Sequence, residues 1–211
     1  MPKVTKTGDR RRAQRARVGR KATRPQAGIM ALRLKPARLS PSMEAFFKSC
    51  EEKVGFVPNV MQAFSFDMAK LEAFVAYRND LMLAGSGLST LEREMIATVV
   101  SAQNRCFYCI TAHGAAVRQL AGDPVLGEMM AMNYRAARLS KRRRAMLDFA
   151  VKLTMEPWAI EESDRAGLRG AGFSDRDIWD IAAVAAFYNM TNRLASATDM
   201  RPNGEYHAKA R

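Results

Sequence analysis

The sequence has few of the residues that build disulfide frameworks and metal centres. Its 211 residues include three cysteines and two histidines. Small secreted proteins stabilised by disulfides use a denser set of cysteines, and the N-terminal region has no apolar signal-peptide core. We therefore expect a protein of the reducing cytoplasm.

Long apolar runs are also absent. No stretch approaches the roughly 18 consecutive apolar residues that a membrane-spanning helix needs. Hydrophobic residues still make up 48% of the chain, which is enough for the core of one domain or of two closely packed helical halves. We expect a soluble protein without a membrane partner.

Acidic residues are scarce at the N-terminus. Residues 1–38 contain 13 of the 34 Lys and Arg residues and one of the 21 acidic residues, so most of the net charge of +13 belongs to them. Because this segment has few large apolar residues, we predict a basic, disordered extension over residues 1–38 and a folded domain over 39–211. No aromatic residues alternate with its arginines, as stacking on single strands requires, so we do not expect a nucleic-acid partner.

The origin of this extension stays open on the sequence. Met30 is a candidate for the true start of the protein. An Arg-rich targeting peptide or a tether to an anionic surface are the other interpretations.

Helical patterns fill the chain after the extension. No run alternates apolar and polar residues as a strand would, and glycines and prolines separate the helical segments. The predicted helices are 42–54, 59–64, 68–83, 89–103, 105–121, 123–134, 140–154, 160–171 and 174–197. The sequence therefore predicts an all-α fold.

A weak internal repeat accompanies these helices. A shift of 85 residues aligns residues 89–113 with 174–198, with six identities that include Asn104 with Asn189. The first segment holds two of the cysteines and a histidine that have no counterpart in the second. The repeat predicts two pseudo-repeated halves, of which one carries the chemistry.

Four residues of the first segment form the most informative motif. Glu94, Cys106, Cys109 and His113 have the spacing Glu-x11-Cys-x2-Cys-x3-His. Helical positions three apart have Cβ atoms about 5–6 Å apart, which brings the two cysteines within disulfide reach, and positions four apart share a face. Thiols can cycle between dithiol and disulfide, while an imidazole and a carboxylate can move and hold a proton.

A helix break is required for the motif to assemble. In one unbroken helix Glu94 and Cys106 would lie roughly 18 Å apart. We predict that Asn104 caps a new helix, so that the chain turns back and places His113 level with Glu94. Both cysteines would then lie near a helix N-terminus, where an anion is favoured and the pKa of a thiol commonly falls below its free value of about 8.5.

These residues carry a resemblance to a known family. The stretches 92–97, 104–109 and 113–114 resemble the alkylhydroperoxidase AhpD family, within the carboxymuconolactone decarboxylase-like group, and more narrowly its all-helical peroxidase-related branch. Residues 172–175 and 192–195 add to the resemblance, which spans roughly 41–207. It implies an AhpD-like fold in which Cys109 attacks the peroxide through a sulfenic acid and Cys106 resolves it. Glu94 would be the ultimate base, with His113 and a water relaying the proton.

The resemblance also has implications for partners. It implies a peroxide substrate, an external dithiol or lipoyl-type reductant, a homo-oligomer and no cofactor. One departure is Tyr108, which stands where AhpD proper has a histidine directly before the second cysteine, so the proton relay can differ. Relatives that act as decarboxylases lack the cysteine pair, and we do not expect that activity here.

Two other functions use the same side chains. Two thiolates, an imidazole and a carboxylate match the coordination number of zinc, although structural zinc sites rarely use a carboxylate. A redox sensor would oxidise once without turnover. The third cysteine, Cys50, is interpreted as a small apolar residue without a redox role. Our leading hypothesis is a thiol peroxidase that reduces hydrogen peroxide or organic hydroperoxides.

Overall fold

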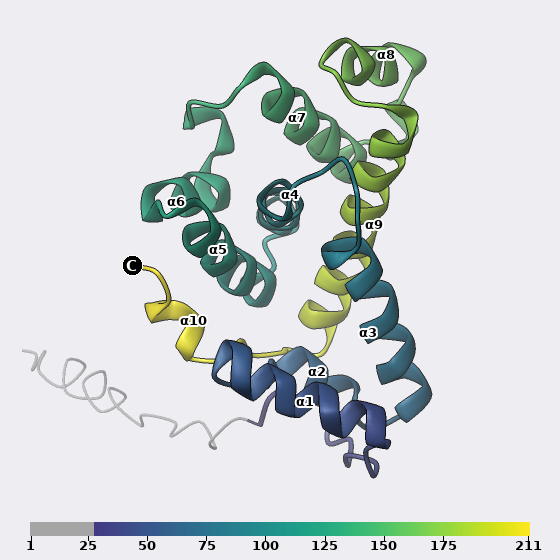
Figure 1. The fold of residues 1–211 in the computed structure, drawn as a ribbon, viewed down its shortest axis with the longest axis vertical. Helices are drawn as coiled ribbons and strands as arrows, with labels where there is room; N and C mark the ends of the chain where they lie inside the picture. The colour runs from purple at the N-terminus through teal and green to yellow at the C-terminus, as the bar shows by residue number, and fades with distance from the viewer. Residues whose placement is uncertain (1–27) are drawn as a thin grey trace, which may run out of the picture.

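The computed structural model describes residues 28–211, which form a bundle of helices (Figure 1). In this range the regular elements are α-helices and two short 3-10 helices, so the predicted all-α class is confirmed. The residues before 28 lie outside the described range, and the disorder predicted for them stays a prediction. The elements are α1 (Pro41–Val54), α2 (Asn59–Phe64), α3 (Met68–Leu83), α4 (Thr90–Gln103), α5 (Phe107–Ala121), α6 (Pro124–Met132), η1 (Tyr134–Ala136), α7 (Lys141–Met155), η2 (Pro157–Ala159), α8 (Glu162–Gly170), α9 (Asp175–Ala197) and α10 (Glu205–Ala208).

Helix α4 lies at the centre of the bundle. Figure 1 looks nearly along its axis and shows the other helices arranged around it, and α4 packs against α5, α6, α7 and α9. Its side chains are buried on every side, including Met95, Ile96 and Val99, which are fully inaccessible. Each such side chain contributes about 1.5–3 kcal/mol to folding by leaving water. The helix that carries Glu94 is therefore held rigidly by its neighbours.

A reciprocal capping box starts α4. The Ser89 hydroxyl accepts a hydrogen bond from the Glu92 backbone N–H at 3.2 Å, and the Glu92 carboxylate accepts one from the Ser89 N–H at 2.9 Å. Helix α9 begins in the same way with Ser174 and Asp177. Each box satisfies two backbone donors that have no partner within the helix, which fixes where the helix begins.

The break between α4 and α5 occurs where the motif requires it but not in the predicted way. The prediction that Asn104 caps α5 is wrong: Asn104 keeps helical backbone angles and ends α4, whereas Cys106 is the N-cap residue of α5. Arg105 between them adopts the left-handed conformation, with φ of 52°. The Asn104 side chain is occupied elsewhere, because it donates hydrogen bonds to Asn189 and Asn192 of α9.

The pseudo-repeat is not confirmed by the path of the chain. Residues 89–113 fold as two helices with a turn between them, whereas the aligned residues lie within the single 23-residue helix α9 and its caps. The two segments share their capping boxes. Both then continue as a helix to the aligned Asn104 and Asn189, and they differ in architecture after that point.

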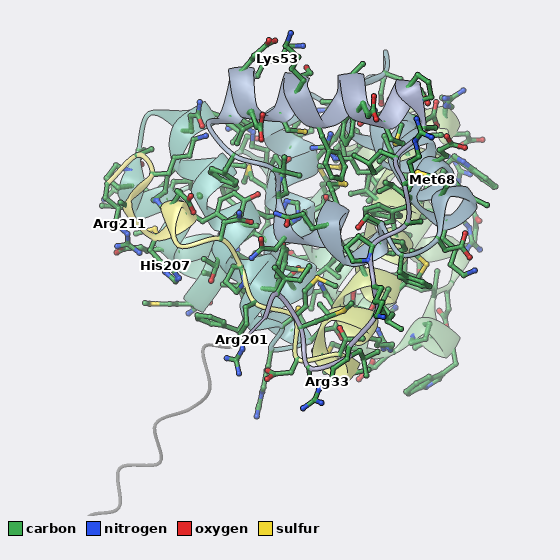
Figure 2. The ribbon with its side chains drawn as sticks, turned by 90° about the horizontal axis from the view of Figure 1, so that it is seen from below. Arg33, Lys53, Met68, Arg201, His207 and Arg211 are labelled. Atoms are coloured by element: carbon green, nitrogen blue, oxygen red, sulfur yellow. The ribbon has the colours of Figure 1, made fainter. Side chains whose placement is uncertain are left out.

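The described part of the predicted extension lies against the helical domain. The Ala31 N–H donates to the Thr198 carbonyl at 2.8 Å, and the Arg201 N–H donates to the Ile29 carbonyl at 2.9 Å. Figure 2 accordingly shows Arg33 and Arg201 at the same edge of the molecule. Residues near 30 are thus held to the chain that follows α9. Among the described residues, no helix has the length and apolar character needed to cross a membrane.

Candidate active site

The turn between α4 and α5 brings Glu94 and His113 together. The Nδ1 atom of His113 lies 2.6 Å from Oε2 of Glu94, and their side chains are 18% and 8% exposed. Glu94 comes from the buried centre of α4 and His113 from the second turn of α5. A carboxylate at this distance fixes the orientation of the imidazole and leaves Nε2 as the ring nitrogen free to exchange a proton.

The two cysteines occupy different positions at the start of α5. Cys106 is the N-cap residue and Cys109 is the third residue of the helix. Both are free thiols and both are buried, at 2% and 4% exposure. A hydrogen bond between the two thiols is the largest influence on the pKa of each, and the residues lie within one turn of helix.

This arrangement separates the acidities of the two thiols. A hydrogen bond donated by the Cys109 thiol is the main cause that lowers the pKa of Cys106 to about 6, and the Cys109 backbone N–H and the Ser196 hydroxyl add to it against the effect of burial. The pKa of Cys109 is raised well above its ordinary value by its hydrogen bond to Cys106 and by burial. The two opposite shifts favour ionisation of Cys106 over ionisation of Cys109.

This result modifies the expectation that both cysteines gain acidity from the helix N-terminus. Unpaired backbone N–H groups stabilise an anion most strongly at the N-cap. Cys106 holds that position because the break falls at Arg105. Cys109 lies one turn further along, where burial has the larger effect.

Cys109 lines a cavity that Cys106 does not reach. The cavity has a volume of about 80 Å³. At roughly 10–15 Å³ for each water, this is room for several water molecules. The side chains around it come from α2, α3, α5, α9 and α10: Val60, Met61, Phe74, Arg78, Tyr108, Cys109, Ala112, His113, Phe187, Tyr188, Thr191 and Tyr206, with Pro58 before α2. The nucleophile and proton carrier named from the sequence, Cys109 and His113, thus face one small space.

Tyr108 lines the cavity and connects two helices. Its hydroxyl accepts a hydrogen bond from the Val60 backbone N–H at 2.8 Å, which joins α5 to α2. Burial raises the pKa of Tyr108, so the phenol stays protonated. The residue that replaces the AhpD histidine therefore orients the start of α5 and keeps its proton at neutral pH, so it does not act as a base.

Helix α9 supplies site residues that the motif did not indicate. Tyr188 packs edge-on against His113, with ring centroids 4.5 Å apart. The side chains of Asn192 and Thr191 hydrogen-bond to Cys109 and partly offset the rise of its pKa, and Asn192 also donates to Ser101 of α4 at 2.9 Å. Their spacing of three and four residues within an apolar helix was the available signal, because it places polar groups on one buried face.

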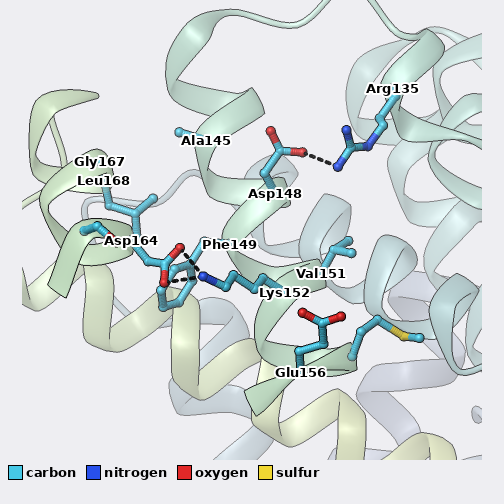
Figure 3. Close-up of a pocket in the computed structure, with 12 residues that line it drawn as sticks. Arg135, Ala145, Asp148, Phe149, Val151, Lys152, Glu156, Asp164, Gly167 and Leu168 are labelled. Carbon is cyan, nitrogen blue, oxygen red and sulfur yellow. Dashed lines mark hydrogen bonds and ion pairs between the residues drawn. The ribbon is translucent and has the colours of Figure 1, made fainter. Parts of the chain in front are cut away.

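A second, larger cavity has a different character. It measures about 590 Å³ and is lined mainly by α7 and α8. Figure 3 shows two ion pairs among its charged groups, Lys152 with Asp164 at 2.7 Å and Arg135 with Asp148 at 3.5 Å, while the Glu156 carboxylate is drawn without a partner. No cysteine or histidine lines it. It offers no nucleophile for redox chemistry.

The zinc alternative finds no support in the donor geometry. Across residues 28–211, no three His, Cys, Asp or Glu side chains are arranged to hold a metal ion. In the motif, the Glu94 carboxylate is engaged by the His113 ring rather than directed with it toward a shared point.

Comparisons with known proteins agree with this geometry. The profile of the carboxymuconolactone decarboxylase family matches residues 70–125, a range that contains the whole motif. No curated protein sequence matches the chain significantly. The debrominase Bmp8 has a similar structure, with a TM-score of 0.71, 20% identity and coverage of 84% of this chain and 95% of that one. At that identity it shows a shared fold.

Two solved structures are much more similar. An uncharacterized peroxidase-related protein from Silicibacter sp. TM1040 is 59% identical, with a TM-score of 0.85 and coverage of 88% of this chain and 97% of that one. An uncharacterized peroxidase-related protein from Ralstonia eutropha JMP134, described as an alkylhydroperoxidase AhpD core, is 39% identical, with a TM-score of 0.83 and coverage of 88% and 98%. The chain therefore belongs to the carboxymuconolactone decarboxylase family, in its AhpD-like, peroxidase-related branch.

Proposed function

We propose that the protein is a thiol peroxidase that reduces hydrogen peroxide or organic hydroperoxides through a dithiol/disulfide cycle of Cys109 and Cys106. The observation that carries the proposal is the different placement of the two sulfurs. Cys109 lines the cavity together with His113, while Cys106 is the helix N-cap residue, does not line the cavity and has a lowered pKa.

The first step is attack by Cys109 on the peroxide. The Cys109 thiol gives up its hydrogen bond to Cys106 and passes its proton to Nε2 of His113, directly or through a water, and Glu94 stabilises the charge that His113 gains. The sulfur forms a bond to one peroxide oxygen as the O–O bond breaks. The second oxygen leaves and takes up the proton, giving an alcohol or water, and Cys109 becomes a sulfenic acid. Because the pKa of Cys109 is raised, this step depends on a base.

The second step is resolution by Cys106. Its thiolate attacks the sulfur of the Cys109 sulfenic acid, an S–S bond forms, and hydroxide leaves and is protonated to water. A pKa of about 6 keeps Cys106 in the reactive form at neutral pH. An external dithiol then reduces the disulfide by two successive exchanges and leaves as a disulfide itself, which closes the cycle. We propose a lipoyl-type dithiol for this role.

Peroxide consumption in the presence of dithiothreitol or dihydrolipoamide tests the proposal. We expect repeated turnover by the wild type and loss of turnover in Cys109→Ser and Cys106→Ser. In the Cys106→Ser protein, dimedone should trap a sulfenic acid on Cys109, because its resolving partner is gone.

Cys50→Ser is the matched control for this experiment. Cys50 is a buried free cysteine on α1 that does not line the cavity, and its replacement should leave the rate unchanged. A rate that survives in both motif variants contradicts the proposal. A single oxidation without turnover in the wild type would indicate a redox sensor instead.

A further inference from the structure

Arg78 is a cation in the wall of the Cys109 cavity that has no anionic partner. It lies near the C-terminal end of α3 and is half-buried. Its Nη1 atom donates to Oδ1 of the neighbouring Asn79 at 3.0 Å, and no carboxylate of residues 28–211 lies within ion-pair distance of its guanidinium. A guanidinium carries five N–H donors in a planar fork. Most of these donors have no protein acceptor in the described part of the chain.

Two phenols of the same cavity add to this set of donors. The hydroxyl groups of Tyr188 and Tyr206 make no side-chain hydrogen bond to described protein atoms, although both residues line the cavity. Burial raises the pKa of both phenols, so they stay neutral donors, while the positive charge of Arg78 opposes this rise at each of them. The charge of Arg78 is therefore felt at both phenols.

The acidic group of the site does not neutralise Arg78. The Glu94 carboxylate acts on both phenols and the Glu205 carboxylate acts on Tyr206, but Glu94 is engaged by His113 at 2.6 Å. The cavity thus has a nucleophile and its base on α5 and α4, and an unpaired cation on α3. Figure 1 shows α3 and α5 as separate walls that flank α4.

We infer that this cavity selects organic hydroperoxides that carry a carboxylate, with Arg78 binding the carboxylate while the peroxide group reaches Cys109. The inference rests on the proposed peroxidase function, because it names the substrate class of the same site. Guanidinium and carboxylate form paired, charge-assisted hydrogen bonds, which fix orientation as well as affinity. The small volume of about 80 Å³ favours a short-chain acid. The product is the corresponding hydroxy acid.

Two substrates that differ in one charge test the inference. The first is 3-hydroperoxy-3-methylbutanoate and the second is its methyl ester, which keeps the hydroperoxide, removes the anion and is one methyl group larger. Arg78→Gln separates the effect of the charge from that of the added methyl group. We expect the wild type to prefer the acid in kcat/KM by about tenfold or more, the ratio that one hydrogen bond to a charged group provides. Arg78→Gln should abolish the preference, and Arg78→Lys should retain part of it because it keeps the charge without the fork.

Arg165→Gln is the matched control. Arg165 is an exposed arginine of α8 that pairs with Glu162 at 2.8 Å, away from the cavity, and its loss should leave the preference for the acid intact. If Arg78→Gln does not fold, Arg78→Lys decides: a reduced preference supports the inference and an unchanged one overturns it.

A binding measurement separates this inference from the peroxidase proposal. Titration calorimetry with 3-hydroxy-3-methylbutanoate, the redox-inert product, should show binding to the reduced wild type, weaker binding of its methyl ester, and loss of the difference in Arg78→Gln. If no hydroperoxide is turned over but this pattern holds, the peroxidase proposal fails and the anion site stands. The inference is overturned if the wild type does not distinguish acid from ester, or if Arg78→Gln still does.

Discussion

The two segments that the sequence aligns, residues 89–113 and 174–198, show what the chemistry of this protein requires from its backbone. Both begin with a capping box, and both have an asparagine fifteen residues after the capping serine. After that asparagine the chain of the first segment turns and starts a new helix, while the second continues as α9.

The backbones of the two segments diverge at one position, Arg105. Arg105 takes the left-handed conformation that ends α4, and the N–H of Cys106 turns back to the Ser101 carbonyl at 3.0 Å. At the aligned place in α9, Asn189 donates from its side chain to the Ala185 carbonyl of the preceding turn, and Met190 remains helical.

The break creates two features that a continuous helix cannot have. It exposes backbone N–H groups beside Cys106, and it returns His113 to the level of Glu94. The unbroken α9 supports these features, because Tyr188, Thr191 and Asn192 project from it toward His113 and Cys109. The comparison teaches that the interrupted segment supplies the reactive groups, and that the continuous helix α9 holds those groups in position.

The largest expected effect comes from removing the base in the interrupted segment. Glu94→Gln and His113→Gln should each lower kcat/KM for peroxide by about 10²–10⁴, because general base catalysis contributes that much and the raised pKa of Cys109 makes a base necessary. Steady-state peroxide consumption measures the effect. Trp179→Phe, at the exposed α9 position aligned with Glu94, should keep the wild-type rate. Equal losses in all three variants would contradict the assignment.

The next largest effect is the pH dependence of the thiolate fraction of Cys106. Its pKa of about 6 lies below the ordinary thiol value of 9.0, so the thiolate is the main form above pH 6. The stability linked to this shift is complete only above the ordinary value and is lost progressively as the pH falls from there through about 6. Between pH 7 and pH 5 the thiolate fraction should fall about tenfold, and resolution with it.

Ultraviolet absorbance of the thiolate measures this titration. Cys109→Ala should move the midpoint upward, because it removes the hydrogen bond that lowers the pKa most. Leu194→Ala, at the position of α9 aligned with Cys109, is the control and should leave the midpoint in place. A wild-type midpoint near the free value of about 8.5 would refute the assigned thiolate.

Two glycine substitutions at aligned positions test the break between α4 and α5, and their expected effects are smaller. Met190→Gly, in the continuous helix, should lower the free energy of unfolding by about 1 kcal/mol, since glycine is a poor helix former. Arg105→Gly should change it by less than about 0.5 kcal/mol or raise it, because glycine adopts positive φ without steric cost. Urea unfolding distinguishes the two, and equal destabilisation would argue against a left-handed Arg105.

The smallest expected difference lies between the two capping boxes. Ser89→Ala and Ser174→Ala should each lower the free energy of unfolding by about 1 kcal/mol, the usual cost of losing an N-cap hydroxyl. The same urea titrations apply. A cost at one position alone would show that the two segments do not begin alike in solution.

Local signals predicted most helices to within a few residues. The capping pair Ser89 and Glu92 marked the start of α4, and the spacing of Cys106, Cys109 and His113 placed them on one side of a helix start. The sequence also showed that a break near Asn104 was needed. It did not show which residue caps α5, because an asparagine suits either end of a helix, and here its amide is bound by Asn189 and Asn192 from a distant helix.

By itself the sequence determined the all-α class and the register of the redox motif, because helical periodicity and capping act over three or four residues. Only the tertiary structure decided which thiol has the lower pKa, which one faces the cavity, and that Arg78 of α3 and Tyr188 of α9 face the same space. These properties depend on burial and on charges brought together from separate helices, and no local spacing encodes such distances.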